Sequence, residues 1–418
     1  MSPPPADPAA SREFAAVVVA RLRAAGHEAY WAGGCVRDEL LGRNPADYDV
    51  ATAATPAIVR AVFGRQRTLA IGAAFGVITV LGPKGAGQVE VATFRADAEY
   101  TDGRHPAGVT FCSAREDAQR RDFTINGLFL DPLTGEIHDY VGGRADLAAS
   151  VVRAIGVPAQ RFGEDHLRML RAVRFTAFFG FVLDGETRAA IERMAHLVIA
   201  VSPERIASEL RAMVERTGRE RALLLLAETG LASEVLPELA PARGSVGESW
   251  GRTAAVVGAL DEPVLPQALA MLASDLDAAT ATRIAGRLRL SSRESKAISW
   301  LQAAMSELGQ ATDLAGRSWS AVQPWVADPR APLLADLLRA RAAHGLGDAA
   351  TAAWFTAQLT RPRAELDPPP LLTGDDLLAA GVPAGRSIGE ALARARTLQL
   401  DGVIATKVQA LAAVRSLP

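Results

Sequence analysis

The stretch from residue 32 to residue 56 (AGGCVRDELLGRNPADYDVATAATP) constrains this chain more than any other part of it. It opens with Gly33-Gly34 and reaches Asp47 and Asp49 on a short apolar run. Glycine has no Cβ, so a glycine pair lets the backbone come close to a ligand. Two carboxylates at positions i and i+2 of a strand project to the same face, where their oxygens can share divalent ions.

Arg37 follows this glycine pair by three residues and can grip phosphate oxygens. Taken alone, an Asp-x-Asp is more often a turn or a surface pair than a metal site, and a Gly-Gly is simply a turn. Their combination in one short window favours a metal site instead. The transfer of a nucleotidyl group from a nucleoside triphosphate would use all three features: a glycine turn, an arginine that binds phosphate and a pair of metal-binding carboxylates.

The composition sets wide limits on what the chain can be. With 418 residues, 49% of them hydrophobic, the chain is long enough for large cores in about two to four domains. The formal net charge of −2 neither indicates nor forbids a nucleic-acid partner, because such binding needs only a local basic face. Two cysteines, Cys35 and Cys112, exclude a disulfide framework and a cysteine-rich zinc module.

The N-terminus and the apolar runs predict a cytoplasmic protein. Residues 1–10 lack a basic segment followed by an apolar one, so they do not predict a signal peptide. The apolar runs are shorter than the ~20 residues that a membrane span needs. The low cysteine content suits a reducing compartment. We therefore expect no membrane association, and no protein partner is indicated.

Hydrophobic patterning predicts a first part in which strands and helices are mixed. Residues 1–10, rich in Pro and Ala, are expected to form a disordered tail before a helix over residues 12–25. Further strands are expected at residues 29–31, 48–51, 77–81, 89–94 and 128–130, and further short helices at residues 38–41 and 55–63.

Glu90 lies between Val89 and Val91, so on a strand it faces away from both valines. If the valines face the core, Glu90 points to the other side of the sheet. There it would join Asp47 and Asp49 as a third carboxylate. A solvated position on the sheet is the alternative.

Two polar segments follow this strand. Residues 95–108 (RADAEYTDGRHPAG), which include Arg95, Asp102 and Arg104, predict a mobile loop. Residues 120–127 (RRDFTING) place two arginines, an aspartate and an asparagine beside apolar residues, a set that could close over a triphosphate and a sugar. The start of an ordinary surface helix is the alternative for this second segment.

From residue 163 the sequence changes to long helices rich in Ala, Leu and Arg. On a helix over residues 164–175, Asp165 and Arg168 are three apart and share a face, and Arg171 and Arg174 continue the row. A salt-bridged, solvated helix face is the usual meaning of such a pattern.

This aspartate and arginine also suit the reading of a base. Adenine and cytosine each present an amino donor beside a ring-nitrogen acceptor, whereas uracil and guanine present the reverse. A carboxylate that accepts from the amino group and a guanidinium that donates to the ring nitrogen would select A and C.

These motifs, in this order, resemble the family of class II tRNA nucleotidyltransferases and bacterial poly(A) polymerases. The resemblance covers about residues 31–210 and is loose beyond them. The residues that match the family's catalytic signature are Gly33-Gly34-x-Val36-Arg37-Asp38 with Asp47-x-Asp49. Its ribose motif is Arg120-Arg121-Asp122-Phe123-Thr124-Ile125-Asn126, its amino-acid template for the base is Glu164-Asp165-x-x-Arg168, and Arg205–Glu209 resembles the helix-turn motif that follows.

The resemblance implies an α+β fold in which a small mixed β-sheet head is followed by an all-α neck, body and tail, in a seahorse-like shape. We accordingly expect five segments: an N-terminal tail and helix at 1–26, the catalytic head at 27–150, the base-recognising neck at 151–215, a helical body at 216–330 and an RNA-binding tail at 331–418.

The resemblance also implies roles for individual residues. Mg²⁺ would be held by Asp47 and Asp49, with Glu90 as a further catalytic carboxylate. The 3′ end of tRNA would be extended with nucleotides from CTP and ATP, and pyrophosphate would be released. By motif position, the nucleotide would be bound by Gly33, Gly34, Arg37, Arg121, Asp122, Asn126, Asp165, Arg168, Arg171 and Arg174.

Within this family the exact activity stays open. Enzymes that add only CC are expected to lack the flexible loop, whereas residues 95–106 look intact here. Addition of the whole CCA is our first choice, because poly(A) polymerases often carry a strongly basic C-terminal extension and residues 408–418 are near neutral. Addition of A alone and poly(A) synthesis are the alternatives, and an inactive RNA-binding relative is the alternative from a different class.

Overall fold

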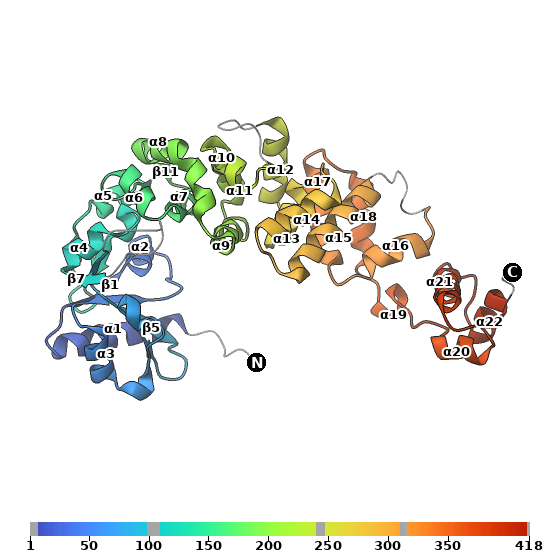
Figure 1. The fold of residues 1–418 in the computed structure, drawn as a ribbon, viewed down its shortest axis with the longest axis horizontal. Helices are drawn as coiled ribbons and strands as arrows, with labels where there is room; N and C mark the ends of the chain where they lie inside the picture. The colour runs from blue at the N-terminus through green and yellow to red at the C-terminus, as the bar shows by residue number, and fades with distance from the viewer. Residues whose placement is uncertain (1–6, 98–108, 240–246, 310–313, 315, 416–418) are drawn as a thin grey trace. The chain divides into compact units, whose positions relative to one another are not determined.

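The computed structural model describes residues 7–97, 109–239, 247–309, 314 and 316–415 (Figure 1). The chain divides into two compact units, Met1–Gly247 and Glu248–Pro418. The first combines a β-sheet with helices, and the second is helical throughout the part that the structure describes. The predicted α+β class, with a mixed sheet first and helices after it, is confirmed.

A seven-stranded sheet forms the centre of the first unit, in the order β3-β4-β5-β2-β1-β8-β9. Neighbouring strands run antiparallel except for β2 and β5, which are parallel and place Asp49 directly opposite Glu90. The strands are β1 Ala29–Ala32, β2 Asp49–Thr52, β3 Thr68–Leu69, β4 Val77–Leu81, β5 Gln88–Thr93, β8 Leu128–Leu130 and β9 Ile137–Asp139.

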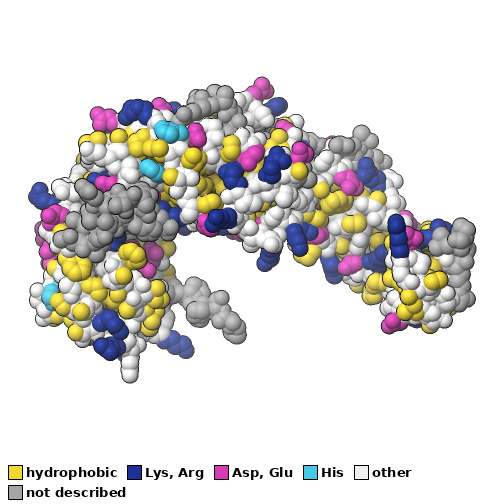
Figure 2. All heavy atoms as spheres, viewed as in Figure 1, with side chains coloured by type: hydrophobic (Ala, Val, Ile, Leu, Met, Phe, Trp, Pro, Cys, Tyr) yellow, Lys and Arg dark blue, Asp and Glu magenta, His cyan; other side chains and the backbone are white. Residues whose placement is uncertain are grey.

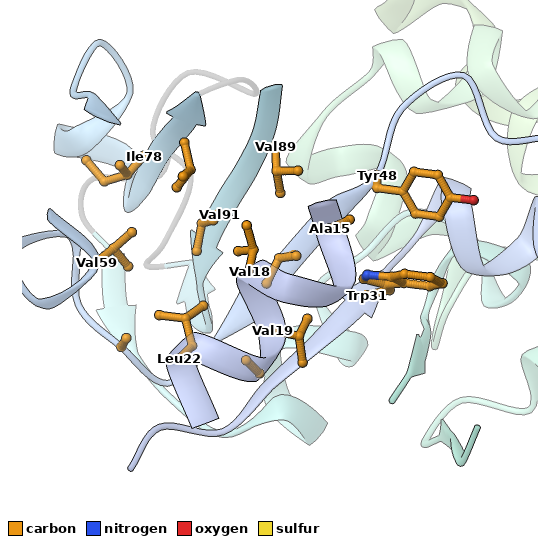
Figure 3. Close-up of a cluster of buried hydrophobic side chains, with 14 of the residues drawn as sticks. Ala15, Val18, Val19, Leu22, Trp31, Tyr48, Val59, Ile78, Val89 and Val91 are labelled. Carbon is orange, nitrogen blue, oxygen red and sulfur yellow. The ribbon is translucent and has the colours of Figure 1, made fainter. Parts of the chain in front are cut away.

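Helix α1, Pro8–Ala24, covers one face of this sheet. Figure 3 shows Val18, Val19 and Leu22 of α1 packed with residues of the strands, among them Val91. The disorder expected for residues 1–10 is wrong from Pro8 onward. Asp7 accepts a hydrogen bond from the amide of Ala9 and Pro8 fits the first helical turn, so the helix begins before the expected residue 12.

The remaining elements of this sheet region are short. Helix α2 spans Gly34–Leu40, so it begins four residues before the expected helix, and α3 spans Pro56–Phe63. Strands β6, Arg95–Asp97, and β7, Val109–Phe111, pair with each other, and helix α4, Ala114–Gln119, follows them.

The prediction of a loop beginning at residue 95 is therefore wrong for its first three residues. Cross-strand pairing with β7, distant along the chain, extends them into a strand. Residues 98–108, with Asp102 and Arg104, lie outside the described residues.

The rest of the first unit is mainly helical (Figure 1). Helix α7 packs against α9 and α10. The elements are α5 Gly143–Ala148, β10 Val151–Val152, α6 Pro158–Glu164, α7 Leu167–Phe179, β11 Val182–Leu183, α8 Gly185–Met194, α9 Pro203–Val214, α10 Arg219–Glu228 and α11 Leu231–Val235.

The second unit consists of helices of very different lengths. On the face seen in Figure 2, Lys and Arg side chains are interspersed with Asp and Glu. No helix in the described ranges is long and apolar enough to cross a membrane. The helices are α12 Glu248–Gly258, α13 Leu265–Leu272, α14 Ala278–Arg287, α15 Ser292–Gly309, α16 Trp319–Val326, α17 Ala331–Ala343, α18 Ala349–Gln358, α19 Arg363–Leu366, α20 Gly374–Ala379, α21 Arg386–Leu400 and α22 Lys407–Arg415.

Candidate nucleotide-binding site

A cavity of about 580 Å³ lies within the first unit and collects residues from three separate stretches of the sequence. Sheet residues, the segment after α4 and the start of α7 all contribute to its walls. The lining residues are Gly33, Gly34, Arg37, Asp47, Asp49, Arg120, Arg121, Asp122, Asn126, Asp165, Arg168, Arg171, Arg174 and Phe175. The ten residues expected to bind the nucleotide are all among them.

The glycine turn shapes one end of this cavity. Gly33 follows β1 with φ of 74°, a conformation that residues with a side chain rarely adopt. A Cβ at this position would lie 2.7 Å from Nη1 of Arg121, so the missing side chain makes room for that guanidinium. The turn thereby brings the backbone and an arginine together, as a phosphate site requires.

Asp47 and Asp49 lie on the same side of the cavity, just before and at the start of β2. Burial raises the pKa of Asp49 to about 6, and the nearby negative charges of Asp47 and Glu90 add to this effect, while Arg121 opposes it. The carboxylate remains open toward the cavity. A divalent cation would relieve this repulsion, and carboxylate oxygens are the ligands that hard cations prefer, so the residues present fit such an ion.

Glu90 lies beside this pair without lining the cavity. Glu90 lies on β5 and is paired in register with Asp49 on the parallel neighbouring strand β2. Both side chains therefore project from the same face of the sheet. Val89 and Val91 are buried on the opposite face, against α1. Among the described residues, no cluster of three or more His, Cys, Asp and Glu side chains has the arrangement of a metal site.

A hydrogen-bonded chain of side chains connects the sheet with α7. Arg37 donates to Oδ1 of Asn126 at 2.6 Å, and Nδ2 of Asn126 donates to Oδ1 of Asp122 at 3.0 Å. Arg171 then donates to Oδ2 of Asp122 through both Nη2, at 2.6 Å, and Nε, at 2.8 Å. Burial would raise the pKa of Asp122, but Arg171 and Asn126 outweigh it and lower the pKa to about 2.

Asp165 lies between two helices and not inside one. The expected helix over residues 164–175 is interrupted, because α6 ends at Glu164 and α7 begins at Leu167. Oδ1 of Asp165 accepts from the amide of Leu167 at 3.1 Å, and this local hydrogen bond competes with continued helix. Oδ2 accepts from Nη2 of Arg205, on α9, at 2.8 Å.

Arg168 is held from two directions. Its Nη1 donates to Oε2 of Glu164 at 2.5 Å and to the carbonyl of Arg161, and its Nη2 donates to the carbonyl of Arg120 at 3.2 Å. The side chain is mostly buried, with 9% of the residue exposed. Asp165 and Arg168 therefore reach the cavity as a fixed acceptor and a fixed donor.

Phe175 is a cavity residue that the sequence analysis did not single out. The guanidinium carbons of Arg37, Arg171 and Arg174 lie 5.3, 5.2 and 4.3 Å from the centre of its ring. Arg174 also donates to Oε2 of Glu209, on α9, at 2.7 Å. A phenylalanine within an amphipathic helix signals only a buried position, so its contacts with three arginines were not readable from the sequence.

Asp117 was also missed, whereas Arg120 belongs to the segment expected to close over a triphosphate and a sugar. Asp117 is buried and forms ion pairs with Arg120 at 2.7 Å and with Arg121 at 3.1 Å. The spacings of three and four residues along a helix were the available signal. Arg95, expected in the flexible loop, lies on β6 and donates from its side chain to the carbonyl of Phe75.

Comparison with known proteins identifies two family domains. Residues 29–153 match the Poly A polymerase head domain, and residues 180–243 match a domain described as the probable RNA and SrmB-binding site of polymerase A. The first match contains the glycine turn, Asp47, Asp49 and the segment of Arg121 and Asp122. Members of this family generally use a divalent metal ion.

Curated relatives are similar over the same region. A CCA-adding enzyme of Anoxybacillus flavithermus is 45% identical over 224 residues, which are 53% of this chain and 55% of the relative. A CCA-adding enzyme of Geobacillus stearothermophilus is 43% identical over 53% of this chain and 54% of the relative. The chain thus spans about half the length of the curated relatives that it matches.

Solved structures extend the similarity along the chain. The Bacillus stearothermophilus CCA-adding enzyme in complex with CTP has a TM-score of 0.78 and 27% identity and covers 97% of both chains. The Thermotoga maritima CCA-adding enzyme complexed with tRNA shares the fold, with a TM-score of 0.67 and 19% identity over 97% of this chain and 94% of that one. Residues 29–153 and 180–243 therefore carry the head and RNA-binding domains of the poly(A) polymerase family, and the chain is similar to CCA-adding enzymes in sequence and in fold.

Proposed function

We propose that this chain is a template-independent nucleotidyltransferase that uses CTP and ATP to add or repair the CCA sequence at the 3′ end of tRNA. The observation that carries the proposal is one cavity that has a carboxylate pair, Asp47 and Asp49, and also a fixed acceptor and donor, Asp165 and Arg168. The first pair suits phosphoryl chemistry, and the second suits the choice of a base.

The relatives support the same activity. The curated relatives named above are CCA-adding enzymes, and a related structure of 27% identity was solved with CTP. Structures that share the fold were solved with ATP and with tRNA. We therefore assign CTP and ATP as the substrates and the 3′ end of tRNA as the acceptor.

In the proposed reaction the 3′-hydroxyl oxygen of the RNA attacks the α-phosphorus of the bound nucleotide. A new phosphodiester bond forms, the bond between the α-phosphorus and the bridging oxygen breaks, the hydroxyl proton is released and pyrophosphate leaves. Mg²⁺ held by Asp47 and Asp49 would make the 3′-hydroxyl more acidic and would neutralise charge on the leaving group. Glu90 is paired in register with Asp49 and adds negative charge beside the two aspartates. This charge increases the affinity of the pair for a cation.

Arginines and the glycine turn bind the rest of the nucleotide in this proposal. Arg37 and Arg121 flank the turn at Gly33 and offer guanidinium donors to the triphosphate. Asp122 and Asn126, fixed by their mutual hydrogen bond, contact the ribose.

Base selection follows from the fixed positions of Asp165 and Arg168. Each carboxylate oxygen of Asp165 accepts one hydrogen bond within the protein and has a further lone pair for the amino group of cytosine or adenine. Arg168 donates to the adjacent ring nitrogen, whereas uracil and guanine would present a donor there. Arg171 and Arg174 line the same part of the cavity.

The wider organisation is part of the proposal. The head at 27–150 performs the chemistry, the neck at 151–215 selects the base, the segment at 216–330 is a helical body, and the tail at 331–418 binds RNA. The segment that follows β6, with Asp102 and Arg104, lets the pocket change from CTP to ATP. The protein acts in the cytoplasm.

Incubation with three tRNA transcripts tests this function. The transcripts end at the discriminator base, at CC and at CCA, and each receives Mg²⁺ with CTP, ATP or both. We expect three nucleotides on the first, one on the second, none on the third and then a stop. Extension of the CC end alone would indicate an A-adding enzyme, long ladders with ATP would indicate a poly(A) polymerase, and RNA binding without extension would indicate an inactive relative.

A further inference from the structure

Asp117 lies behind the nucleotide cavity, on α4, and does not line it. The residue is 1% exposed, and its carboxylate is surrounded by donors. Oδ1 accepts from Nε of Arg120 at 2.9 Å and from the amide of Arg95 at 3.3 Å. Oδ2 accepts from Nε and Nη2 of Arg121 at 3.2 and 3.1 Å.

The two arginines that Asp117 holds serve different parts of the cavity. The edge of Arg121 that Asp117 does not hold faces the glycine turn. Its Nη1 occupies the space that a Cβ on Gly33 would need and donates to the carbonyl of Asn126 at 3.4 Å. The carbonyl of Arg120 accepts from Nη2 of Arg168, the proposed base-reading donor.

We propose that Asp117 is a positioning residue for nucleotide binding, which fixes the guanidinium group of Arg121 at the triphosphate. This inference rests on the function proposed above and goes beyond it, because Asp117 touches neither the nucleotide nor the reacting atoms. It acts by restricting the orientation of the guanidinium group of Arg121.

The charges explain why one carboxylate suffices for two arginines. A single negative charge between two guanidinium groups leaves a net positive charge, which attracts phosphate oxygens to Arg121 in the cavity wall. An asparagine would offer one acceptor oxygen, while its NH₂ group would face the N–H groups of the other arginine. Asp117→Asn therefore frees one arginine while keeping nearly the same volume.

Titration calorimetry with CTP and Mg²⁺ on the full chain tests this role. We expect Asp117→Asn to weaken CTP binding by about 10- to 100-fold, because charge-assisted hydrogen bonds that fix the binding groups are lost. In steady-state addition to a CC-accepting tRNA, KM for CTP should rise by a similar factor with kcat changed less than about 3-fold, since the phosphates are held in both ground and transition states.

Asp131→Asn is the matched control. Asp131 is also buried in the sheet region and accepts from Nη1 of Arg23 at 2.6 Å, but neither residue lines the cavity. A role of Asp117 in folding alone predicts that both variants lose thermal stability and neither loses CTP affinity. If Asp117→Asn does not fold, Asp117→Glu keeps the charge but displaces it by one methylene, and the same shift in CTP affinity is expected.

A double-mutant cycle completes the test. If Asp117 acts through Arg121, Asp117→Asn will weaken CTP binding much less in an Arg121→Gln background than in the unmodified protein. Equal fold-changes in the two backgrounds, or CTP affinity equal to that of Asp131→Asn, would overturn the inference while leaving the proposed function intact. An unmodified protein that binds CTP yet extends no tRNA would overturn the proposed function instead, and the binding cycle would still decide the role of Asp117.

Discussion

The two units differ in which polar side chains they bury. Among the described residues, the first unit buries six charged side chains and the second buries one, Asp336. The six are Arg37, Asp117, Asp122, Asp131, Arg168 and Glu209. In the second unit, buried glutamines take this place: Gln302 donates to the carbonyls of Ala273 and Leu276, and Gln323 donates to that of Leu366.

The same residue type shows the difference most clearly. Asp122 in the first unit has a pKa lowered to about 2, because Arg171 and Asn126 outweigh burial. Burial raises the pKa of Asp336 in the second unit, and the hydrogen bond from Gln267 and the charge of Arg339 offset this only in part. Burying an ion costs several kcal/mol unless it is well paired, so groups of buried ions indicate a ligand site more than a source of stability.

The largest expected effect comes from Asp49→Asn. We expect nucleotide addition to fall by at least about 10³-fold, because the proposed metal ion, which would stabilise transition-state charge, would lose a ligand. Thermal stability of the metal-free protein at pH 7 should be maintained, since the substitution removes a carboxylate whose ionisation is disfavoured in the folded state. Single-turnover incorporation and thermal unfolding measure both, with Asp375→Asn on exposed α20 as the control. Loss of activity in Asp375→Asn, or full activity in Asp49→Asn, would contradict the assignment of the chemistry to the first unit.

Gly33→Ala should follow, with a loss of roughly 10²-fold in affinity for CTP, because the new Cβ must displace the guanidinium of Arg121. Gly26→Ala is the matched control. Gly26 also has a positive φ, of 86°, but its Cβ would meet nothing within 4 Å. If both variants lost CTP affinity equally, backbone strain and not the displaced arginine would be responsible.

Asp165→Ala should reduce base discrimination. We expect the preference for CTP over UTP to fall by roughly 5- to 100-fold, the contribution of one well-placed pair of hydrogen bonds. Competition between the two nucleotides in single-nucleotide addition measures this ratio. Glu186→Ala on the exposed start of α8 is the control, and an unchanged preference in Asp165→Ala would exclude it from base reading.

Asp122→Asn tests, through the pH dependence of stability, whether a buried charge of the first unit stabilises the fold. The folded-state pKa of about 2 is below the ordinary value of 3.8, so the ionised carboxylate stabilises the folded state above pH 3.8 and this stabilisation disappears as the pH falls through 2. The variant should be less stable by on the order of 2 kcal/mol at pH 7. Urea unfolding at pH 7, 5 and 3 measures the difference, which should shrink toward acid pH. A difference that stays constant with pH would mean that the charge is not responsible.

The smallest effect on activity is expected in the second unit. Gln302→Leu leaves two carbonyls without their donor and should cost about 1 to 3 kcal/mol of unfolding free energy. CTP affinity should stay within about 2-fold of the unmodified protein, because no cavity residue is touched. Calorimetric binding and thermal unfolding check both values, and a clear loss of CTP affinity would show that the units do not divide these tasks.

The sequence predicted those features that depend on neighbours along the chain. Strand β4 has the expected bounds, and the residues of the glycine turn and of the segment around Asp122 line the cavity, because turn geometry and charge impose fixed residue types at fixed spacing. The pairing of β6 with β7 joins residues far apart in sequence, so composition alone suggested a loop at Arg95. Asp165 leaves the helical pattern because of its own side-chain hydrogen bond, which periodicity does not detect.

The ring of Phe175 has a consequence for the thermodynamics of nucleotide binding. Arginine side chains are long, and ordering each one on binding costs about 0.5 to 1.5 kcal/mol in lost rotamer freedom. Here the guanidinium groups of Arg37, Arg171 and Arg174 all lie over one buried ring, which restricts their rotamers. Their entropy is therefore lost when the chain folds. An incoming triphosphate meets side chains that are already ordered, so more of its interaction energy remains as affinity.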